Sequence, residues 1–338
     1  MAEARFFHIT PTAKPRPLAD LDQAVACLES PGYVWLDYYD PTREQIEPLV
    51  SALGVHPLTV EDCLDEEQVP KIEDYPGNTF LLVNGFRYDG ETLVFEEIDF
   101  VIGKNYLITV HGHGDAGWRF LDGLADRVSV ELDMAARGAE YLMHVILDYV
   151  IDKKLTAIEA LQDRIDATEE DLIQDTGAFD PGALLRLRRD LLAMRKSLFH
   201  EREILGKICR RDSPFVGEKA IYDYRDLYDH LTKSFEIVEV YREMVTNAME
   251  MYLSLVNNKM SIVANRTNAT VRRLTLITTV FMPLTLLAGI GGMSEWSMMT
   301  GPANWRLSYP LFLAAMAVIG AISYRVLAWL ERRDPNAR

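Results

Sequence analysis

The sequence contains few cysteines and lacks the motifs of common enzymes. Cys27, Cys63 and Cys209 are far apart and form no CxxC pair, which indicates reduced thiols rather than disulfides or a zinc cluster. The segment GKNYL at 103–107 does not have the spacing of a phosphate-binding loop. No nucleophile–base motif and no paired carboxylates in an evident pocket are present. We therefore expect that the chain is not an enzyme.

Positive charge is also scarce. The chain has 35 Lys and Arg against 51 Asp and Glu, a net charge of −16 at pH 7. Such a surface repels nucleic acid and concentrates cations nearby. We expect no nucleic-acid partner.

Charge is missing altogether from two long apolar runs near the C-terminus. The first covers residues 274–292, 19 residues in all, and the second covers 308–324 and continues past Arg325 as VLAWL. A helix needs about 20 apolar residues to cross a bilayer. Because soluble cores seldom hold two such runs so close together, we expect two transmembrane helices rather than a buried hairpin. The N-terminus has no apolar stretch of the kind found in signal peptides.

The basic residues that flank these runs predict their orientation. The loop between the runs carries only Glu295 and Arg306. By the positive-inside rule, both termini are cytoplasmic and the loop is external, as in a multi-pass protein of the inner cell membrane. The flanking basic residues are Arg266, Arg272, Arg273, Arg325, Arg332 and Arg333.

The fold class predicted is α+β, with a cytoplasmic α/β domain at residues 1–135. Segments rich in β-branched and aromatic residues predict its strands, and Asp89-Gly90 is a hairpin signal between two of them. The expected strands are 33–37, 79–88, 92–103 and 105–112, and the expected helices are 42–52 and 56–63.

From residue 136 onward the pattern becomes helical. Two amphipathic stretches, 139–175 and 181–211, predict an antiparallel hairpin within a region that extends to residue 229. No glycine or proline lies between Gly217 and Pro283. We therefore expect a short helix near 219–227, followed by one long helix of about 60 residues and about 90 Å. The expected remaining segments are this stalk and pore helix at 230–292, an external loop at 293–307, a second span at 308–330 and a basic cytoplasmic tail at 331–338.

Small and polar residues form one stripe of the first span at steps of three and four. Such a stripe is typical both of tight helix packing and of a wet lumen, and the pattern alone leaves the two open. An uncharged lumen suits an ion that keeps most of its water, as Mg²⁺ does. Two spans per chain can enclose a pore only in a cyclic homo-oligomer. The stripe consists of Asn268, Val271, Thr275, Thr278, Met282, Thr285, Gly289 and Gly292.

Three segments together resemble the CorA family of divalent-metal-ion transporters. They are VHPLTVEDCLDEEQVPKIEDY at 55–75, YRDLYDH at 224–230 and the pore-helix segment at 264–293. The resemblance implies a funnel-shaped homopentamer with passive, gated flow of Mg²⁺, and also of Co²⁺ or Ni²⁺. It places Asn268, Thr275 and Met282 at pore-lining positions, and it places Leu274 near a hydrophobic constriction.

The resemblance also implies regulatory carboxylates in the cytoplasmic region. Asp62 and Asp226 match positions where family members bind Mg²⁺ between subunits, and Glu61 and Asp229 are their neighbours. A dication between such carboxylates would stabilise the closed assembly.

The mouth of the pore departs from the family pattern. The family has Tyr-Gly-Met-Asn there, whereas this chain has Gly291, Gly292, Met293 and Ser294. An altered mouth leaves two alternatives open: a zinc transporter of the ZntB type, and a membrane-anchored metal sensor that conducts nothing. His111 and His113 do not favour the zinc alternative, because no cysteine or carboxylate lies at ligand spacing.

Overall fold

The structure is a computed structural model that describes residues 3–11, 13–65, 68–88, 91–112, 120–121, 123–124, 127–128, 131–292, 301 and 304–333. The chain forms two compact units, Met1–Tyr252 and Leu253–Arg338.

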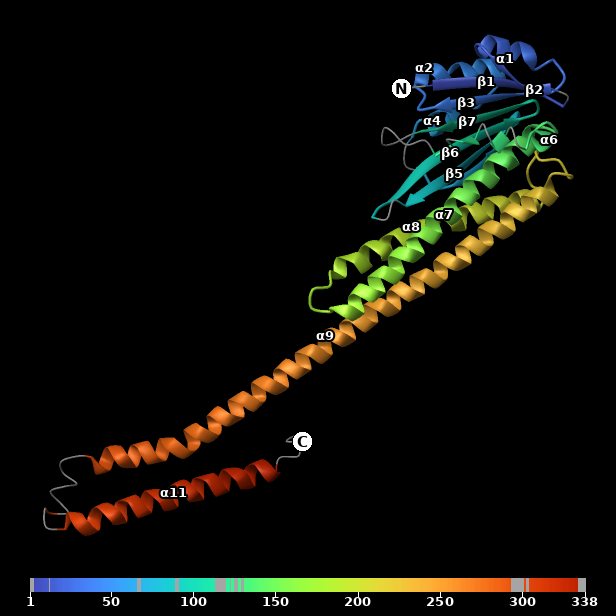
Figure 1. The fold of residues 1–338 in the computed structure, drawn as a ribbon. Coiled ribbons are helices and arrows are strands. Elements are labelled where there is room, and N and C mark those ends of the chain that lie inside the picture. Colours follow the sequence, from blue (N-terminus) through green and yellow to red (C-terminus); the bar gives the residue numbers. More distant parts are fainter. Residues whose placement is uncertain are drawn as a thin grey trace. The chain divides into compact units, whose positions relative to one another are not determined.

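The first unit contains a seven-stranded sheet in the order β2-β1-β3-β7-β6-β5-β4 (Figure 1). Neighbouring strands are antiparallel except β3 and β7, which are parallel. The strands are β1 (Glu3–Thr10), β2 (Ala13–Leu18), β3 (Tyr33–Tyr39), β4 (Lys71–Asp74), β5 (Asn78–Tyr88), β6 (Leu93–Gly103) and β7 (Tyr106–His111).

Four of these strands agree with the sequence prediction. They are β3, β5, β6 and β7, which are rich in buried side chains. Three further strands, β1, β2 and β4, were not predicted. The turn at 89–90 lies outside the described residues.

Short helices cover the sheet and close its core. They are α1 (Leu21–Cys27), α2 (Arg43–Ile46), α3 (Pro48–Leu53) and α4 (Pro57–Asp62). A further short helix, α6 (Leu132–Ala135), packs against the helix that follows it, at 139–174. The helix predicted at 42–52 is in fact two helices, because Pro48 has no N–H to donate and begins a new helix. Pro57 begins α4 in the same way, and the His56 imidazole accepts a hydrogen bond from the backbone N–H of Leu58.

The predicted helical hairpin is confirmed as α7 (Ala139–Gln174) and α8 (Pro181–Cys209). Asp180 ends the connection between them, since its carboxylate accepts a hydrogen bond from the Gly182 N–H at 2.8 Å. Helix α7 packs against β5 and β6, and α8 packs against β4 and β5.

The long helix α9 (Ile221–Gly291) is 71 residues long and includes the first apolar run. A separate short helix near 219–227 is wrong, because no glycine or proline interrupts the chain there and one helix continues. The helix also continues through Pro283. The second apolar run forms α11 (Trp305–Arg333).

Candidate cation pore and regulatory carboxylates

The polar stripe of the first span lies on the exposed side of α9. Every stripe residue from Asn268 to Gly292 is exposed within this chain. The residues of the same span that are partly covered include Leu276, Val280, Leu284 and Leu287. At 3.6 residues per turn, this covered face is about half a turn away from the stripe.

Helix α11 packs against the covered face. A methyl group at Gly320 of α11 would lie 3.5 Å from the Leu284 side chain, and one at Gly291 would meet the Phe312 ring at 2.7 Å. The second span of the same chain therefore does not use the stripe as its packing surface. The stripe remains available for a lumen or for another subunit.

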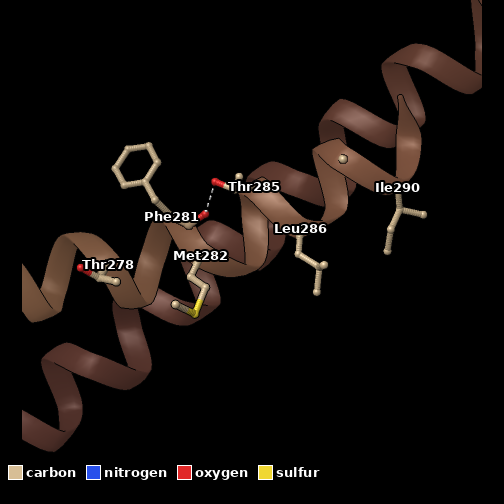
Figure 2. A pocket seen from close by; sticks show the side chains of 7 residues that line it. Thr278, Phe281, Met282, Thr285, Leu286 and Ile290 are labelled. Atoms are coloured by element: carbon tan, nitrogen blue, oxygen red, sulfur yellow. Dashed lines mark hydrogen bonds between the residues drawn. The ribbon is translucent and has the colours of Figure 1, made fainter. Parts of the chain in front are cut away.

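A shallow, open pocket lies over the middle of the stripe. Thr278, Met282, Thr285 and Gly289 line the concave surface together with Phe281, Leu286 and Ile290 (Figure 2). Gly289 contributes no side chain, and nothing lies within 4 Å of the position that a methyl group there would occupy. This surface combines hydroxyls with apolar side chains and contains no charge.

The threonine hydroxyls of the stripe are oriented by the helix itself. Thr275, Thr278 and Thr285 each donate a hydrogen bond to the carbonyl four residues earlier, at 2.9, 2.8 and 2.8 Å. Figure 2 shows the bond from Thr285 to Phe281. Because each hydroxyl hydrogen is used in this way, the oxygen offers lone pairs. Water bound to a cation points its hydrogens outward, so these oxygens suit a hydrated cation.

At the end of α9, Gly291 allows the close approach of Phe312. Any larger residue at 291 would require the ring to move, since even a methyl group would lie at 2.7 Å. The absence of a side chain at position 291 is thus matched by an aromatic ring from the second span. Met293 and Ser294 lie outside the described residues.

Asp62 ends α4 and is paired within its own chain. Its carboxylate accepts a hydrogen bond from the Lys71 ammonium at 2.7 Å, and the two side chains are 21% and 29% exposed. The backbone of Asp62 is held as well, because its carbonyl accepts the Gln68 side-chain amide at 2.7 Å. Sequence reasoning did not identify Lys71, although it lies in the segment that resembles the family.

Two buried carboxyls on β6 lie near this pair. Burial raises the pKa of Glu97 to about 7, and the negative charges of Asp65 and Asp62 add to the effect. Burial also raises the pKa of Asp99 well above its usual range, as do the charges of Glu97 and Asp62. The segment FEEIDF places acidic residues on both faces of a predicted strand. This pattern indicates buried carboxyls, and our prediction did not use it.

The remaining candidate carboxylates are exposed. The Asp226 side chain on α9 is 70% exposed and lies 3.9 Å from His230 one turn later, and Glu61 and Asp229 are exposed too. Over the part of the chain that is described, no three His, Cys, Asp or Glu side chains gather closely enough to hold a metal ion. The described residues of one chain therefore do not form a complete metal site from Asp62 and Asp226.

His111 belongs to a different buried network. Its ring nitrogens lie 3.2 Å from Asp37 and 3.6 Å from Glu96. Burial lowers its pKa, but the hydrogen bonds and charges of these two carboxylates outweigh burial and raise the pKa to about 9. A protonated imidazole has no free lone pair for zinc. His113 lies outside the described residues.

The two apolar C-terminal helices decide between a soluble core and membrane-spanning segments. Their most apolar windows have a mean hydropathy of 1.9 and 2.0, and neither window is buried inside the chain. The structure therefore contains no buried hairpin at these two runs, and both C-terminal helices are long and apolar enough to cross a membrane after the large α/β domain.

The comparisons with known proteins then identify the family. The model of the CorA-like Mg2+ transporter protein family matches residues 30–333, so the chain belongs to this family of metal-ion transporters. The cobalt/magnesium transport protein CorA of Thermotoga maritima is 29% identical over 90% of this chain and 84% of its own length. The solved structure of the CorA magnesium transporter from Methanocaldococcus jannaschii has a TM-score of 0.70, with 23% identity over 98% of both chains.

Proposed function

We propose that the chain forms a homopentameric channel that carries Mg²⁺ passively across the cell membrane, with Co²⁺ and Ni²⁺ as further cargo. The observation that carries this proposal is the placement of the exposed polar stripe opposite the face that α11 covers. In a ring of subunits, the first span would line the lumen and the second would form the outer layer. Both termini would be cytoplasmic. The names of the relatives, which include cobalt and magnesium transport proteins, support the choice of ions.

The lumen of this channel would pass a hydrated ion. The stripe from Asn268 to Gly289 contains no carboxylate that could replace the water of Mg²⁺. The threonine hydroxyls instead accept hydrogen bonds from the water shell. Leu274 would form the narrow apolar constriction, and Gly292, Met293 and Ser294 would form the outer mouth.

Regulation would use Asp62 and Asp226 from adjacent subunits, with Glu61 and Asp229 beside them. The structure supports this arrangement in that Asp226 is exposed. Mg²⁺ held between subunits would lower the free energy of the closed assembly. Asp62→Ala combined with Asp226→Ala should abolish Mg²⁺-dependent protection against proteolysis, and unchanged protection would contradict this assignment.

Ion-resolved flux into liposomes tests the proposed transport. The purified chain should admit Mg²⁺, Co²⁺ and Ni²⁺ down their gradients without nucleotide. Leu274→Ser should increase flux by widening and wetting the constriction, whereas Leu313→Ser on α11 is a control of the same chemistry on the second span. A well-folded pentamer without metal flux would favour the non-conducting sensor, and flux of Zn²⁺ alone would favour the zinc transporter. Comparing Ser294→Asn in the same assay tests whether the mouth residue affects the choice of ion.

A further inference from the structure

Asp62 of the proposed regulatory site already forms an ion pair within its own chain, and its partner is Lys71. The ammonium of Lys71 lies 2.7 Å from Asp62 Oδ2 and 3.7 Å from Glu73 Oε1. It also lies 5.5 Å from the centre of the buried Phe80 ring. The aromatic ring and the two carboxylates therefore define where the ammonium can be.

The surroundings of Lys71 are strongly acidic. Burial works against the charge of Lys71, but the hydrogen bond and charge of Asp62 and the charge of Glu73 outweigh it and raise the pKa of the lysine. Its charge also acts on Glu97 and Asp99. One ammonium thus serves as the counter-ion of a cluster that would otherwise attract a cation from solution.

A divalent cation and this ammonium would compete for the same carboxylate. Mg²⁺ and Ca²⁺ bind carboxylate oxygens at about 2.0 to 2.6 Å, and the ammonium is already within hydrogen-bond distance of Asp62 Oδ2. Two positive charges at one carboxylate repel each other. Glu73 offers the displaced ammonium a second partner only 3.7 Å away.

We propose that Lys71 is an internal competitor for the divalent cation at Asp62. The ammonium occupies the Asp62 carboxylate when the cation is scarce, and it shifts to Glu73 when the cation binds. Lys71 thereby sets the cation concentration at which the regulatory site responds. This inference rests on the proposed role of Asp62 in cation sensing.

The expected effect follows from the exposure of the pair. Ion pairs at a protein surface change an equilibrium by up to about fivefold, and a partly buried pair lies near the top of this range. Lys71→Gln should therefore lower the Mg²⁺ concentration for half-protection by about two- to fivefold. Glu73→Gln should raise it by about twofold, because the displaced ammonium loses its second partner. Lys71→Arg should stay within about twofold of the unchanged protein, since it keeps the charge.

The chain offers a closely matched control. Lys207 pairs with Asp74 at 2.6 Å, and both side chains are 30% exposed. Lys207→Gln removes the same charge from the same domain without touching Asp62, so its half-protection concentration should not change. An equal shift in Lys207→Gln would mean that net charge causes the effect, and it would overturn the proposal.

The experiment is limited proteolysis of the full chain in detergent during Mg²⁺ titration. Chymotrypsin is suitable because the Lys71 and Lys207 variants do not alter its cleavage sites. Thermal unfolding without Mg²⁺ checks that every variant is folded. An unchanged or higher half-protection concentration in Lys71→Gln would overturn the proposal, because it would mean that Lys71 only positions Asp62. If Asp62→Asn left protection intact, the sensor role of Asp62 would fail as well, whereas liposome flux tests conduction independently.

Discussion

A buried ion pair links the helical hairpin to the sheet and allows a quantitative prediction. Lys154 of α7 contacts Glu201 of α8, and these side chains are 1% and 4% exposed. Glu201 also accepts hydrogen bonds from the Asn84 backbone N–H of β5 at 3.0 Å and from the Ser197 hydroxyl at 3.1 Å. One carboxylate therefore joins two helices and a strand.

We expect each single change in this pair to be costly. Removing one partner of a buried ion pair costs about 3 to 5 kcal/mol, because the other charge remains buried without compensation. Lys154→Met and Glu201→Gln should each lower the free energy of unfolding by about 3 kcal/mol. In the double variant neither charge is left buried without its partner, and the glutamine keeps an oxygen that can accept the Asn84 N–H. The double variant should therefore lose about 3 kcal/mol rather than the sum of the two single losses, which is a coupling free energy of about 3 kcal/mol.

Urea unfolding of a fragment covering residues 1–252, followed by circular dichroism, measures these values, and thermal unfolding of the full chain in detergent checks their order. The control is Glu239→Gln, which removes the partner of Arg195 in an ion pair whose side chains are 42% and 28% exposed. It should cost less than about 1 kcal/mol. Additive losses in the double variant, or single losses no larger than that of the control, would refute the reasoning.

Three further predictions concern titratable groups and the end of α9. Burial raises the pKa of Glu97 from 4.5 to about 7, so its contribution to stability is present below pH 4.5 and lost as the pH rises through 7. Glu97→Gln should make the urea concentration at half-unfolding nearly independent of pH between pH 5 and 8, and it should raise that concentration at pH 8. The pKa of His111 is raised from 6.5 to about 9, so its contribution is present below pH 6.5 and lost through pH 9; His111→Gln should cost about 3 kcal/mol at pH 7 and much less at pH 10, by the same assay. Gly291→Ala should lower the melting temperature in detergent, and adding Phe312→Leu should restore it, because the methyl group and the ring share one space; no restoration would contradict this packing.

The sequence predicted the elements whose residue patterns are clear. The two apolar runs and the helical hairpin are long enough for their composition and periodicity to be recognised. The strands β3, β5, β6 and β7 are rich in β-branched and aromatic residues. The break between α2 and α3 at Pro48 and the continuity of α9 were not recognised. Both depend on how single residues end or extend a helix, which is the least certain part of sequence reasoning.

Two of the three unpredicted strands, β2 and β4, have a physical reason for weak patterns. β2 and β4 are the two edges of the sheet, and β2 has the sequence AKPRPL, in which each proline lacks a donor for the ladder. β4 is only four residues long and reads KIED. Such segments become strands through pairing with a neighbour rather than through their own propensity. Because β4 was missed, the contact between Lys71 and Asp62 could not be foreseen.

The proposed transport and its regulation place opposite demands on the chain. A regulatory site must hold its cation long enough to stabilise one state of the assembly, which favours carboxylates and partial burial. A conducting lumen must release each ion quickly, which favours weak contacts with the water shell. The chain separates these demands, since residues 274–292 contain no charged residue whereas Asp62, Lys71 and Glu97 are clustered in the α/β domain. A change in the Lys71 pair should therefore shift the cation concentration that closes the channel without altering which ion passes through it.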